Sequence, residues 1–334
     1  MTSPPTIQAK AVEKIIRAAA ARGVAAQELY QAANLDPAGL DDPDRRILFA
    51  QVVAIYEQAA RLTNDDAFGL HVGETVDPKA FDVLGYSVIN SSTLGEAIDR
   101  AVRYNFIWTN GSYFSIDKGS SLTRLVYVYV DDSITERRHD AEMTFAALAS
   151  LSRNVTGADL SPTRVTFQHD RPRNTTEHRR IFNCPVEFGA PANQYFFDAS
   201  ALKLPIVKAD PGLCAVLDRH AESLTAKYPR HDTLVERVRT MIKDELSGGN
   251  ASLERIADNL SMSGRTLQRK LREHGTSHQE LLDQMRRDLA MRYLQEREMA
   301  ICEVAYLLGF SESSSLHRAF KRWTGQTPNE FRRR

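Results

Sequence analysis

The chain has 334 residues, 42% of them hydrophobic, and a formal net charge of zero, which fits two globular domains that each bury a core. No run of about 18 apolar residues exists, so no membrane span is expected. The three cysteines have neither metal-ligand nor disulfide-framework spacing, and the N-terminus lacks a secretory pattern, so a cytoplasmic protein is expected.

Apolar residues recur at helical spacing over most of the first hundred residues. The strongest case is Ile47–Leu62, whose inner face would carry Val52, Val53, Ile55, Tyr56 and Ala59. Further helices are expected at Ala11–Ala21, Ala25–Ala33, from Phe68, at Phe81–Ile89 and at Thr93–Tyr104, the last begun by a capping-box pattern.

The pattern then changes to period two. Tyr113–Ile116 and Leu122–Val130 are rich in β-branched and aromatic residues, and the turn residues Asp117–Ser121 separate them, which predicts an antiparallel hairpin. Residues 1–228 are therefore expected to form an α+β domain with helices and a small, mainly antiparallel sheet. Its other elements are a long helix at Thr135–Arg153, strands at Thr163–Gln168, Val186–Phe188 and Gln194–Phe197, and helices at Thr175–Phe182 and Gly212–Lys227.

The front half carries no motif of a known catalytic or metal site. It has no nucleophile elbow, phosphate loop or zinc-ligand spacing, so no catalytic residue, metal or cofactor is expected. His169 and His178 are expected on the surface. An aromatic cluster around the hairpin, Trp108, Tyr113, Phe114, Tyr127 and Tyr129, suits either an effector pocket or a satisfied core, and the sequence favours the core.

Charge is divided unevenly along the chain. Residues 229–334 hold 19 Lys/Arg and 15 Asp/Glu, whereas residues 1–228 hold 24 and 28. The positive excess of the second part, which ends in Arg332-Arg333-Arg334, suits a partner with phosphates. The boundary is expected at the proline after Tyr228, with a helix at Thr233–Leu246 and a break at Ser247–Asn250 beyond it.

A helix-turn-helix pattern follows at about 252–274. Leu253, Ile256, Ala257 and Leu260 would line its first helix, and Ser263 would cap the second. The second helix keeps Leu267 and Leu271 inside. Its outer residues can read bases or hold phosphates, because Arg pairs with guanine, Gln with adenine and spare cations with the backbone.

The segment at about 277–295 has apolar residues at helical spacing and no breaker, which predicts one long helix. About 20 helical residues span roughly 30 Å. Major grooves on one side of B-DNA repeat at roughly 34 Å. This helix could therefore seat two reading helices in neighbouring grooves.

The second helix-turn-helix pattern lies at about 300–324. Ile301, Val304, Ala305 and Leu308 line its first helix, Gly309 turns the chain, and Phe310 can fill the corner. Ser311 or Ser313 can cap the reading helix, Ser313–Thr324. The inner stripe of that helix is Leu316, Ala319, Phe320 and Trp323. Two such units in tandem favour DNA binding over the alternative of a helical bundle with basic solvated faces.

Residues 229–334 closely resemble the DNA-binding domain of the AraC/XylS family of bacterial transcription regulators. The most specific part runs from Ile301-x-x-Val-Ala through Gly309-Phe310 to Thr324-Gly-x-Thr-Pro328. By position, the resemblance implies base contacts from Arg265, Gln268, Arg269, Ser313, Ser314, His317 and Arg318. Phosphate contacts, or plain surface charges, are expected at Lys270, Arg272, Lys321 and Arg322.

The front half resembles the "arabinose-binding" domain that accompanies one branch of this family, through motifs such as Phe68-Gly-Leu70-x-x-Gly73 and Ser92–Ala97. The resemblance implies an activator that answers an unidentified small-molecule effector, binds double-stranded promoter DNA and recruits RNA polymerase. A homodimer is expected. The alternatives are an architectural DNA-binding protein and an enzymatic or ligand-binding front domain with a vestigial DNA module.

Overall fold

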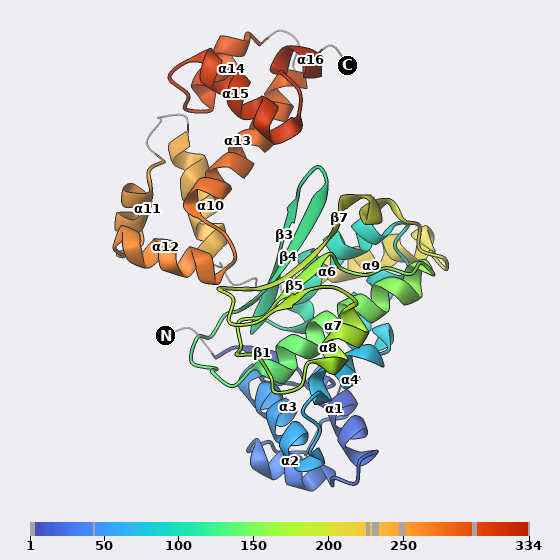
Figure 1. The fold of residues 1–334 in the computed structure, drawn as a ribbon. Helices are drawn as coiled ribbons and strands as arrows, with labels where there is room; N and C mark the ends of the chain where they lie inside the picture. Colours follow the sequence, from blue (N-terminus) through green and yellow to red (C-terminus); the bar gives the residue numbers. More distant parts are fainter. Residues whose placement is uncertain are drawn as a thin grey trace. The chain divides into compact units, whose positions relative to one another are not determined.

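The computed structural model describes residues 4–42, 44–224, 228, 234–246, 251–295 and 299–332. The chain divides into two compact units, the front unit Met1–His231 and the rear unit Asp232–Arg334, and Figure 1 shows the course of each. Three expected features lie outside the described residues: the proline boundary after Tyr228, the break at 247–250, and the last two arginines of the terminal basic run.

Helices form the first part of the front unit, as the apolar spacing predicts. The inner face predicted for the helix at Ile47–Leu62 is confirmed, because Val52, Val53, Ile55, Tyr56 and Ala59 are all buried. The helices are α1 (Ala11–Ala20), α2 (Ala26–Ala32), α3 (Phe49–Thr63), α4 (Phe68–Glu74), the 3-10 helix η1 (Pro78–Phe81), α5 (Asp82–Ile89) and α6 (Leu94–Trp108).

A two-stranded ribbon was not expected from the sequence. Strand β1 (Thr6–Gln8) pairs antiparallel with β2 (Arg46–Leu48), so the helix predicted from Ile47 begins at Phe49 instead. The Arg46 side chain fixes the ribbon by donating from Nε to Thr6 Oγ1 at 2.9 Å and from Nη1 to the Ile107 carbonyl at 2.8 Å. A strand partner about 40 residues away thus overrides the local helical pattern.

The predicted hairpin is confirmed as β3 (Ser112–Lys118) and β4 (Leu122–Tyr129), which pair antiparallel. They form one side of a five-stranded sheet in the order β3-β4-β7-β5-β6. Figure 1 labels β3, β4, β5 and β7 of this sheet. Only the β5–β6 pair is parallel, so the sheet is mainly antiparallel, as expected. The remaining strands are β5 (Arg164–Thr166), β6 (Val186–Glu187) and β7 (Asn193–Asp198).

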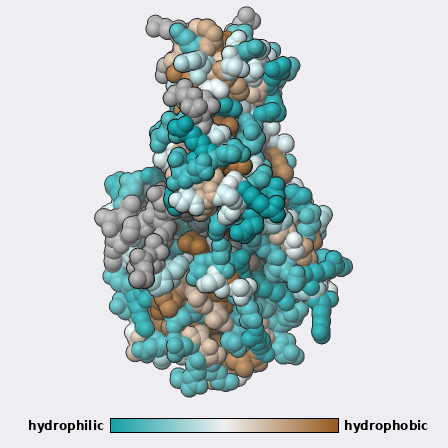
Figure 2. All heavy atoms as spheres, turned by 90° about the vertical axis from the view of Figure 1, so that its left-hand side faces the viewer, coloured by the Kyte–Doolittle hydropathy of each residue, from teal (hydrophilic) through white to brown (hydrophobic). Residues whose placement is uncertain are grey.

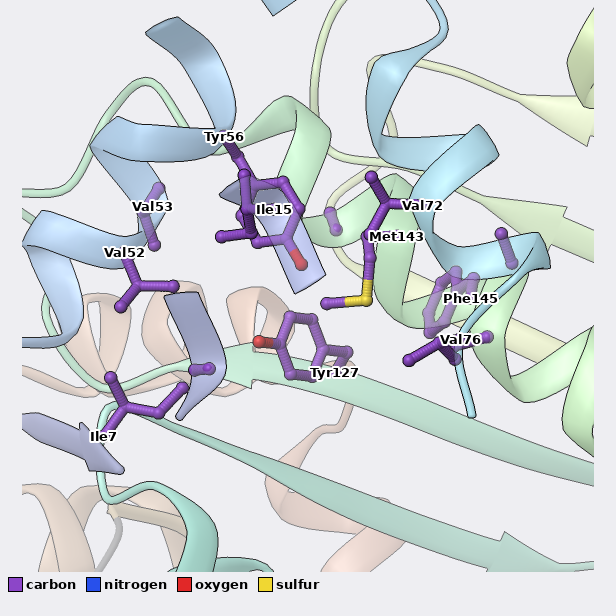
Figure 3. Packing of buried hydrophobic residues seen from close by; sticks show 14 of the residues in the cluster. Ile7, Ile15, Val52, Val53, Tyr56, Val72, Val76, Tyr127, Met143 and Phe145 are labelled. Carbon is purple, nitrogen blue, oxygen red and sulfur yellow. The ribbon is translucent and has the colours of Figure 1, made fainter. Parts of the chain in front are cut away.

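Helix α7 (Arg138–Thr156) packs closely against α4 through two glycines of α4. A Cβ atom at Gly69 would lie 2.2 Å from the His139 carbonyl oxygen, and one at Gly73 would lie 2.3 Å from that of Met143. Behind this contact the helices share one apolar core with the sheet, part of which Figure 3 shows. The unit is completed by α8 (Thr176–Phe182), η2 (Ala199–Lys203) and α9 (Pro211–Ser223).

The rear unit is helical and has a single core of its own. That core takes side chains from both helix-turn-helix pairs and from the helix that joins them, so the rear unit folds around one interior. The last helix was not predicted. The helices are α10 (Leu234–Leu246), α11 (Leu253–Asn259), α12 (Gly264–Glu273), α13 (His278–Gln295), α14 (Ile301–Leu307), α15 (Ser313–Thr324) and α16 (Pro328–Arg332).

Hydrophilic residues cover most of the face seen in Figure 2. Among the described residues, every helix is too short or too polar to span a lipid bilayer. Single exposed apolar side chains, such as Leu62, Val207 and Tyr306, interrupt the polar surface.

Candidate nucleic-acid interface and effector pocket

The first helix-turn-helix pair forms as predicted. The chain turns at Ser261, whose φ of 54° is left-handed. Ser263 then caps α12, because its hydroxyl accepts a hydrogen bond from the Thr266 backbone N–H at 3.2 Å. This bond satisfies one of the free N–H groups at the helix start.

Helix α12 buries one stripe and exposes the other. Leu267 and Leu271 are fully buried in the rear core. Arg265, Gln268 and Arg269 are exposed on the outer side. Arg269 forms an ion pair with Glu273 one turn later. Of the two expected phosphate contacts, Arg272 is exposed and Lys270 is half-buried.

The second pair is built differently at its turn. Gly309 takes the left-handed backbone, with a φ of 70°, after the buried residues Val304, Ala305 and Leu308. The predicted serine cap is wrong. Glu312 occupies the N-cap position, and its side chain makes no capping bond to the helix backbone. Ser313 is already the first helical residue.

Helix α15 buries Leu316, Ala319 and Phe320 and leaves Trp323 half-buried. Of its predicted reading residues, Ser313, Ser314 and Arg318 are exposed and His317 is half-buried. Three of these side chains already contact neighbouring residues at the start of the helix. Ser314 Oγ donates to Glu312 at 2.9 Å, His317 Nδ1 lies 2.9 Å from the Ser313 carbonyl oxygen, and Arg318 donates to Ser315 Oγ at 3.3 Å.

The two cations at the end of α15 are also exposed. Arg322 reaches across to α13 and pairs with Asp283 at 2.9 Å. A phosphate contact from Arg322 would therefore have to replace an existing ion pair. No such pair with a described residue is seen for Lys321.

Helix α13 runs between the two pairs (Figure 1). Its 18 residues give a rod about 27 Å long. Leu281, Leu282, Ala290 and Leu294 bury its inner side in the core that both pairs share. The connector helix predicted at about 277–295 is thus confirmed, and it is packed along its length.

Sequence reasoning missed Arg286, which fixes the second turn to α13. Its Nε donates to the Leu308 carbonyl at 2.9 Å and its Nη2 to the Gly309 carbonyl at 3.2 Å. The guanidinium also lies 4.4 Å from the centre of the Phe310 ring. Burial lowers the pKa of Arg286 below its ordinary value, but arginine stays charged in proteins. The cation therefore holds the end of α14 and the corner residue together.

The Thr324-Gly-x-Thr-Pro328 motif closes α15 and starts α16. Gly325 ends α15 in the left-handed region, with a φ of 78°. Thr327 and Glu330 then form a reciprocal cap, in which the Thr327 backbone N–H donates to Glu330 at 2.7 Å and the Glu330 N–H donates to Thr327 Oγ1 at 3.3 Å. Phe331 of α16 packs on Phe320 with ring centres 5.5 Å apart. The motif is structural, since it anchors the reading helix.

The front unit encloses a cavity of about 160 Å³ between its helices and the hairpin. Its wall is mainly apolar and includes Phe49, Leu84, Ile98, Met143 and Leu151. Polar groups enter the wall from Lys14, Tyr56, Asn105, Tyr127 and Asp140, among others. An apolar pocket with a few convergent polar groups is the usual form of a small-molecule site.

Asp140 is the centre of the polar wall. The hydroxyls of Tyr127 and Tyr129 donate to its Oδ2 atom at 3.0 and 2.8 Å. Burial raises the pKa of the Asp140 carboxyl, although both hydroxyls act in the opposite direction. Burial and the Asp140 charge raise the pKa of Tyr127 and Tyr129 well above the ordinary value, so both remain donors.

Four residues of the aromatic cluster, Trp108, Tyr113, Tyr127 and Tyr129, were the effector contacts expected from the sequence, and they occupy different places in the structure. Trp108 and Tyr127 line the cavity. Tyr129 lies behind it against Asp140. Tyr113 lies on the other face of the sheet, against Val126, Val128 and Ala192. Strand alternation explains this difference, because the neighbouring Phe114 faces the cavity instead.

The two histidines expected on the surface are not there. His178 is buried, and its Nε2 lies 2.9 Å from Glu142 Oε1. The His169 ring packs against Phe167 with ring centres 4.9 Å apart, and its Nε2 atom lies 3.5 Å from the same carboxylate oxygen. Although burial alone would raise the pKa of Glu142, the His178 hydrogen bond and the Arg138 charge lower it. Among the described residues, no group of three or more His, Cys, Asp or Glu side chains is arranged to hold a metal ion.

Comparison with known proteins finds matches for both the front unit and the rear unit. A family model described as the arabinose-binding domain of AraC transcription regulators matches residues 23–206, and a helix-turn-helix domain matches residues 256–334. The chain is 30% identical to the ornithine utilization regulator of Pseudomonas aeruginosa, over 96% of this chain and 94% of that protein. It is 28% identical to the transcriptional regulator VirS of Mycobacterium tuberculosis, over 89% and 87%.

Among solved structures, the transcriptional regulator CdpR from Pseudomonas aeruginosa aligns with a TM-score of 0.44 and 22% identity, over 92% of this chain and 96% of that chain. The assignment of family rests on the sequence matches, which cover both units. The protein therefore belongs to the AraC family of helix-turn-helix transcription regulators.

Proposed function

We propose that the protein is an effector-responsive activator of transcription that reads two adjacent major-groove segments of one promoter. The observation that carries the proposal is the common core of the rear unit. It fixes α12 and α15 to one α13 rod while each helix keeps a polar outer side. The α13 rod is about 27 Å long, and the major groove repeats at roughly 34 Å. The two lengths are similar, which supports placing α12 and α15 in neighbouring grooves.

The base contacts are assigned to Arg265, Gln268 and Arg269 of α12 and to Ser313, Ser314, His317 and Arg318 of α15. Their exposed or half-buried positions support this assignment. Lys270, Arg272, Lys321 and Arg322 would hold phosphates. Arg269 and Arg322 exchange the Glu273 and Asp283 carboxylates for DNA when they bind.

The front unit is proposed to sense a small molecule in its cavity. Binding would favour one arrangement of the regulator on DNA, in proportion to the ligand's different affinity for the two states. A homodimer would place two reading devices on neighbouring sites and gain affinity by multivalency. The active arrangement would then recruit RNA polymerase.

The test of specific reading uses the full-length protein and the promoter next to its own gene. Protection of two segments one helical turn apart, with affinity at least about a thousandfold above that for random duplex, is expected. Near-equal affinity for all duplexes would favour the alternative of an architectural protein. An enzymatic front unit would instead show turnover of a metabolite in the absence of DNA.

A further inference from the structure

Lys14 supplies the cavity wall with an ammonium group that has no polar partner. It stands on α1, half-buried, and forms no hydrogen bond or ion pair with any residue that the structure describes. Its Nζ atom lies 4.5 Å from the centre of the Phe81 ring and 5.8 Å from that of Trp108. Ring faces attract a cation, but they accept none of its three N–H bonds in the way an oxygen does.

Tyr56 supplies a second unused donor. Its side chain is fully buried, and its hydroxyl has no hydrogen-bond partner among the described residues. Figure 3 shows its ring extending from α3 toward the space beside Tyr127 and Met143, and all three line the cavity. An unsatisfied buried polar group destabilises the protein, so a ligand that accepts this hydrogen bond gains affinity from it.

One acceptor atom in the same wall, an oxygen of the Asp140 carboxylate, is already occupied. Asp140 Oδ2 takes the hydroxyls of both Tyr127 and Tyr129. The Asn105 amide is also used, since it donates to the Ser112 carbonyl at 2.6 Å. Lys14 and Tyr56 are thus two donors on the cavity wall that make no hydrogen bond to a described residue, and an anionic acceptor would suit both.

The rest of the wall limits the body of the ligand. A cavity of about 150 Å³ accommodates a benzene ring, so this one, at about 160 Å³, has room for roughly six to eight carbon atoms. The apolar side chains of its wall include Val88, Leu94, Leu148, Leu151 and Val155. A sugar would leave most of its hydroxyls unpaired against these side chains, so arabinose does not suit the cavity.

Lys14 also borders a groove on the outside of the unit, which is lined by Glu13, Arg17, Thr75 and Lys79 among others. It therefore stands where the cavity wall meets the surface. A ligand that enters with its apolar end first would leave its charged end at Lys14.

We propose that the effector is an apolar monocarboxylate of about six to eight carbons in all, whose carboxylate accepts hydrogen bonds from Lys14 Nζ and Tyr56 Oη. The inference rests on the proposed effector-sensing function and names the chemical class of the effector. One cation matches one negative charge, so dianionic phosphates are disfavoured. Amines would place a second cation beside Lys14.

The first test is calorimetry on the full-length protein with hexanoate, octanoate and benzoate, against 1-hexanol and hexylamine. The carboxylates are expected to bind at least tenfold tighter than the alcohol and the amine. Lys14→Met should weaken carboxylate binding by about 10- to 100-fold, as expected for lost charge-assisted hydrogen bonds. Lys14→Arg keeps the charge and should retain part of the affinity.

Lys10→Met is the matched control, because Lys10 is exposed, lines only the outer groove and lies one turn away. It should leave binding unchanged. Tyr56→Phe should cost about tenfold without altering the fold. The proposal is overturned if the carboxylates bind no tighter than 1-hexanol, if all have Kd values above about 1 mM, or if Lys14→Met and Lys10→Met behave alike.

The pH dependence is a second test. Burial lowers the pKa of Lys14 to about 8 in the free protein, against an opposing effect of Asp140. A bound carboxylate favours the charged form, so affinity should be level below pH 8 and fall up to tenfold per pH unit above it. Affinity that stays level to pH 10 would contradict a role for Lys14. The other ionisable groups that line the cavity or the groove with Lys14 are Lys10, Glu13, Arg17, Arg22, Tyr56, His71, Glu74, Asp77, Lys79, Tyr127 and Asp140.

The position of the apolar body can be tested separately. A second cavity of about 140 Å³ shares Leu94, Ile98, Leu148 and Ser152 with the first. Leu148→Ala should join the two and shift the preference from hexanoate toward decanoate. An unchanged order of chain lengths would mean that the body lies elsewhere and would overturn the assignment.

Promoter binding by the same preparation separates this inference from the proposed function. Specific DNA binding without carboxylate binding would remove the ligand class and leave the regulator intact. Carboxylate binding that depends on Lys14, in a protein without duplex preference, would support the ligand class while the proposed function fails.

Discussion

The two helix-turn-helix pairs share a frame but differ in how the frame is held. The first turns at Ser261 and caps its reading helix with Ser263. The second turns at Gly309, has no side-chain cap, and is held from outside by Arg286 of α13. The first pair is thus stabilised locally, whereas the second depends on the connector helix.

Their outer surfaces differ in the same way. Helix α12 exposes Arg265, Gln268 and Arg269, which reach far, while α15 begins with Ser313 and Ser314, which are short. Short side chains favour water-mediated or backbone contacts. We therefore expect stronger base reading by α12 than by α15.

The largest effect is expected from Arg286→Met. Two carbonyls would lose a charged donor, which costs about 1.5–3 kcal/mol. In hydrogen exchange of the full-length protein, the amides of α14 and of the first turn of α15 should lose protection, while those of α11 and α12 keep theirs. Arg287→Met is the control, because Arg287 is the neighbouring cation of α13 and forms its ion pair with Asp288 of the same helix. Equal loss of protection in both helix-turn-helix pairs would contradict the conclusion that only the second pair depends on α13.

Base reading is compared by Arg269→Ala and Arg318→Ala on a mapped promoter. A bidentate base contact is worth about 1–3 kcal/mol and its loss relaxes preference at one position. Arg269→Ala should lie at the upper end of this range and Arg318→Ala at the lower end. Arg255→Ala, which removes an exposed cation of α11, controls for general charge. Unchanged affinity and unchanged base preference in both variants would remove the assigned roles.

Ser263→Ala should lower the free energy of unfolding by about 1 kcal/mol through loss of its cap. Glu312→Ala, at the matching position of the second pair, should change it by less than about 0.5 kcal/mol, because no capping bond is lost. Urea titration followed by fluorescence measures both. A larger loss for Glu312→Ala would show that the second cap acts in solution.

The smallest effect is expected from the double variant Ser313→Ala, Ser314→Ala. Promoter affinity should fall by less than about 1 kcal/mol, with base preference nearly unchanged, since bridging waters replace part of the lost bonds. Gel-shift titration at fixed salt is sufficient. A loss as large as that of Arg269→Ala would make α15 an equal reader.

Much of the fold follows from local patterns in the sequence. The helices at Ile47–Leu62 and 277–295 and the hairpin are predicted because their apolar residues repeat at one clear period. The errors occur where a distant partner decides. Ile47 belongs to a strand because β1 lies beside it, and His178 is buried because Glu142 of α7 is its partner.

The two candidate sites also differ in how far local sequence patterns predict them. The outward-facing residues of α12 and α15 could be named from the chain, since the buried stripe of an amphipathic helix defines its outer side. Their roles as base contacts remain predictions from the family resemblance. The residues that line the cavity could not be predicted in this way. Lys14 and Tyr56 are some 40 residues apart and stand on separate helices, and only packing places them on one wall.

The sequence by itself determined the two reading helices, their turns and the connector, because these depend on contacts between residues a few positions apart. Tertiary structure alone decided which aromatic side chains face the cavity, which donors there lack partners, and how Arg286 holds the second turn. Those properties arise from surfaces that meet only after folding, and no local periodicity encodes them.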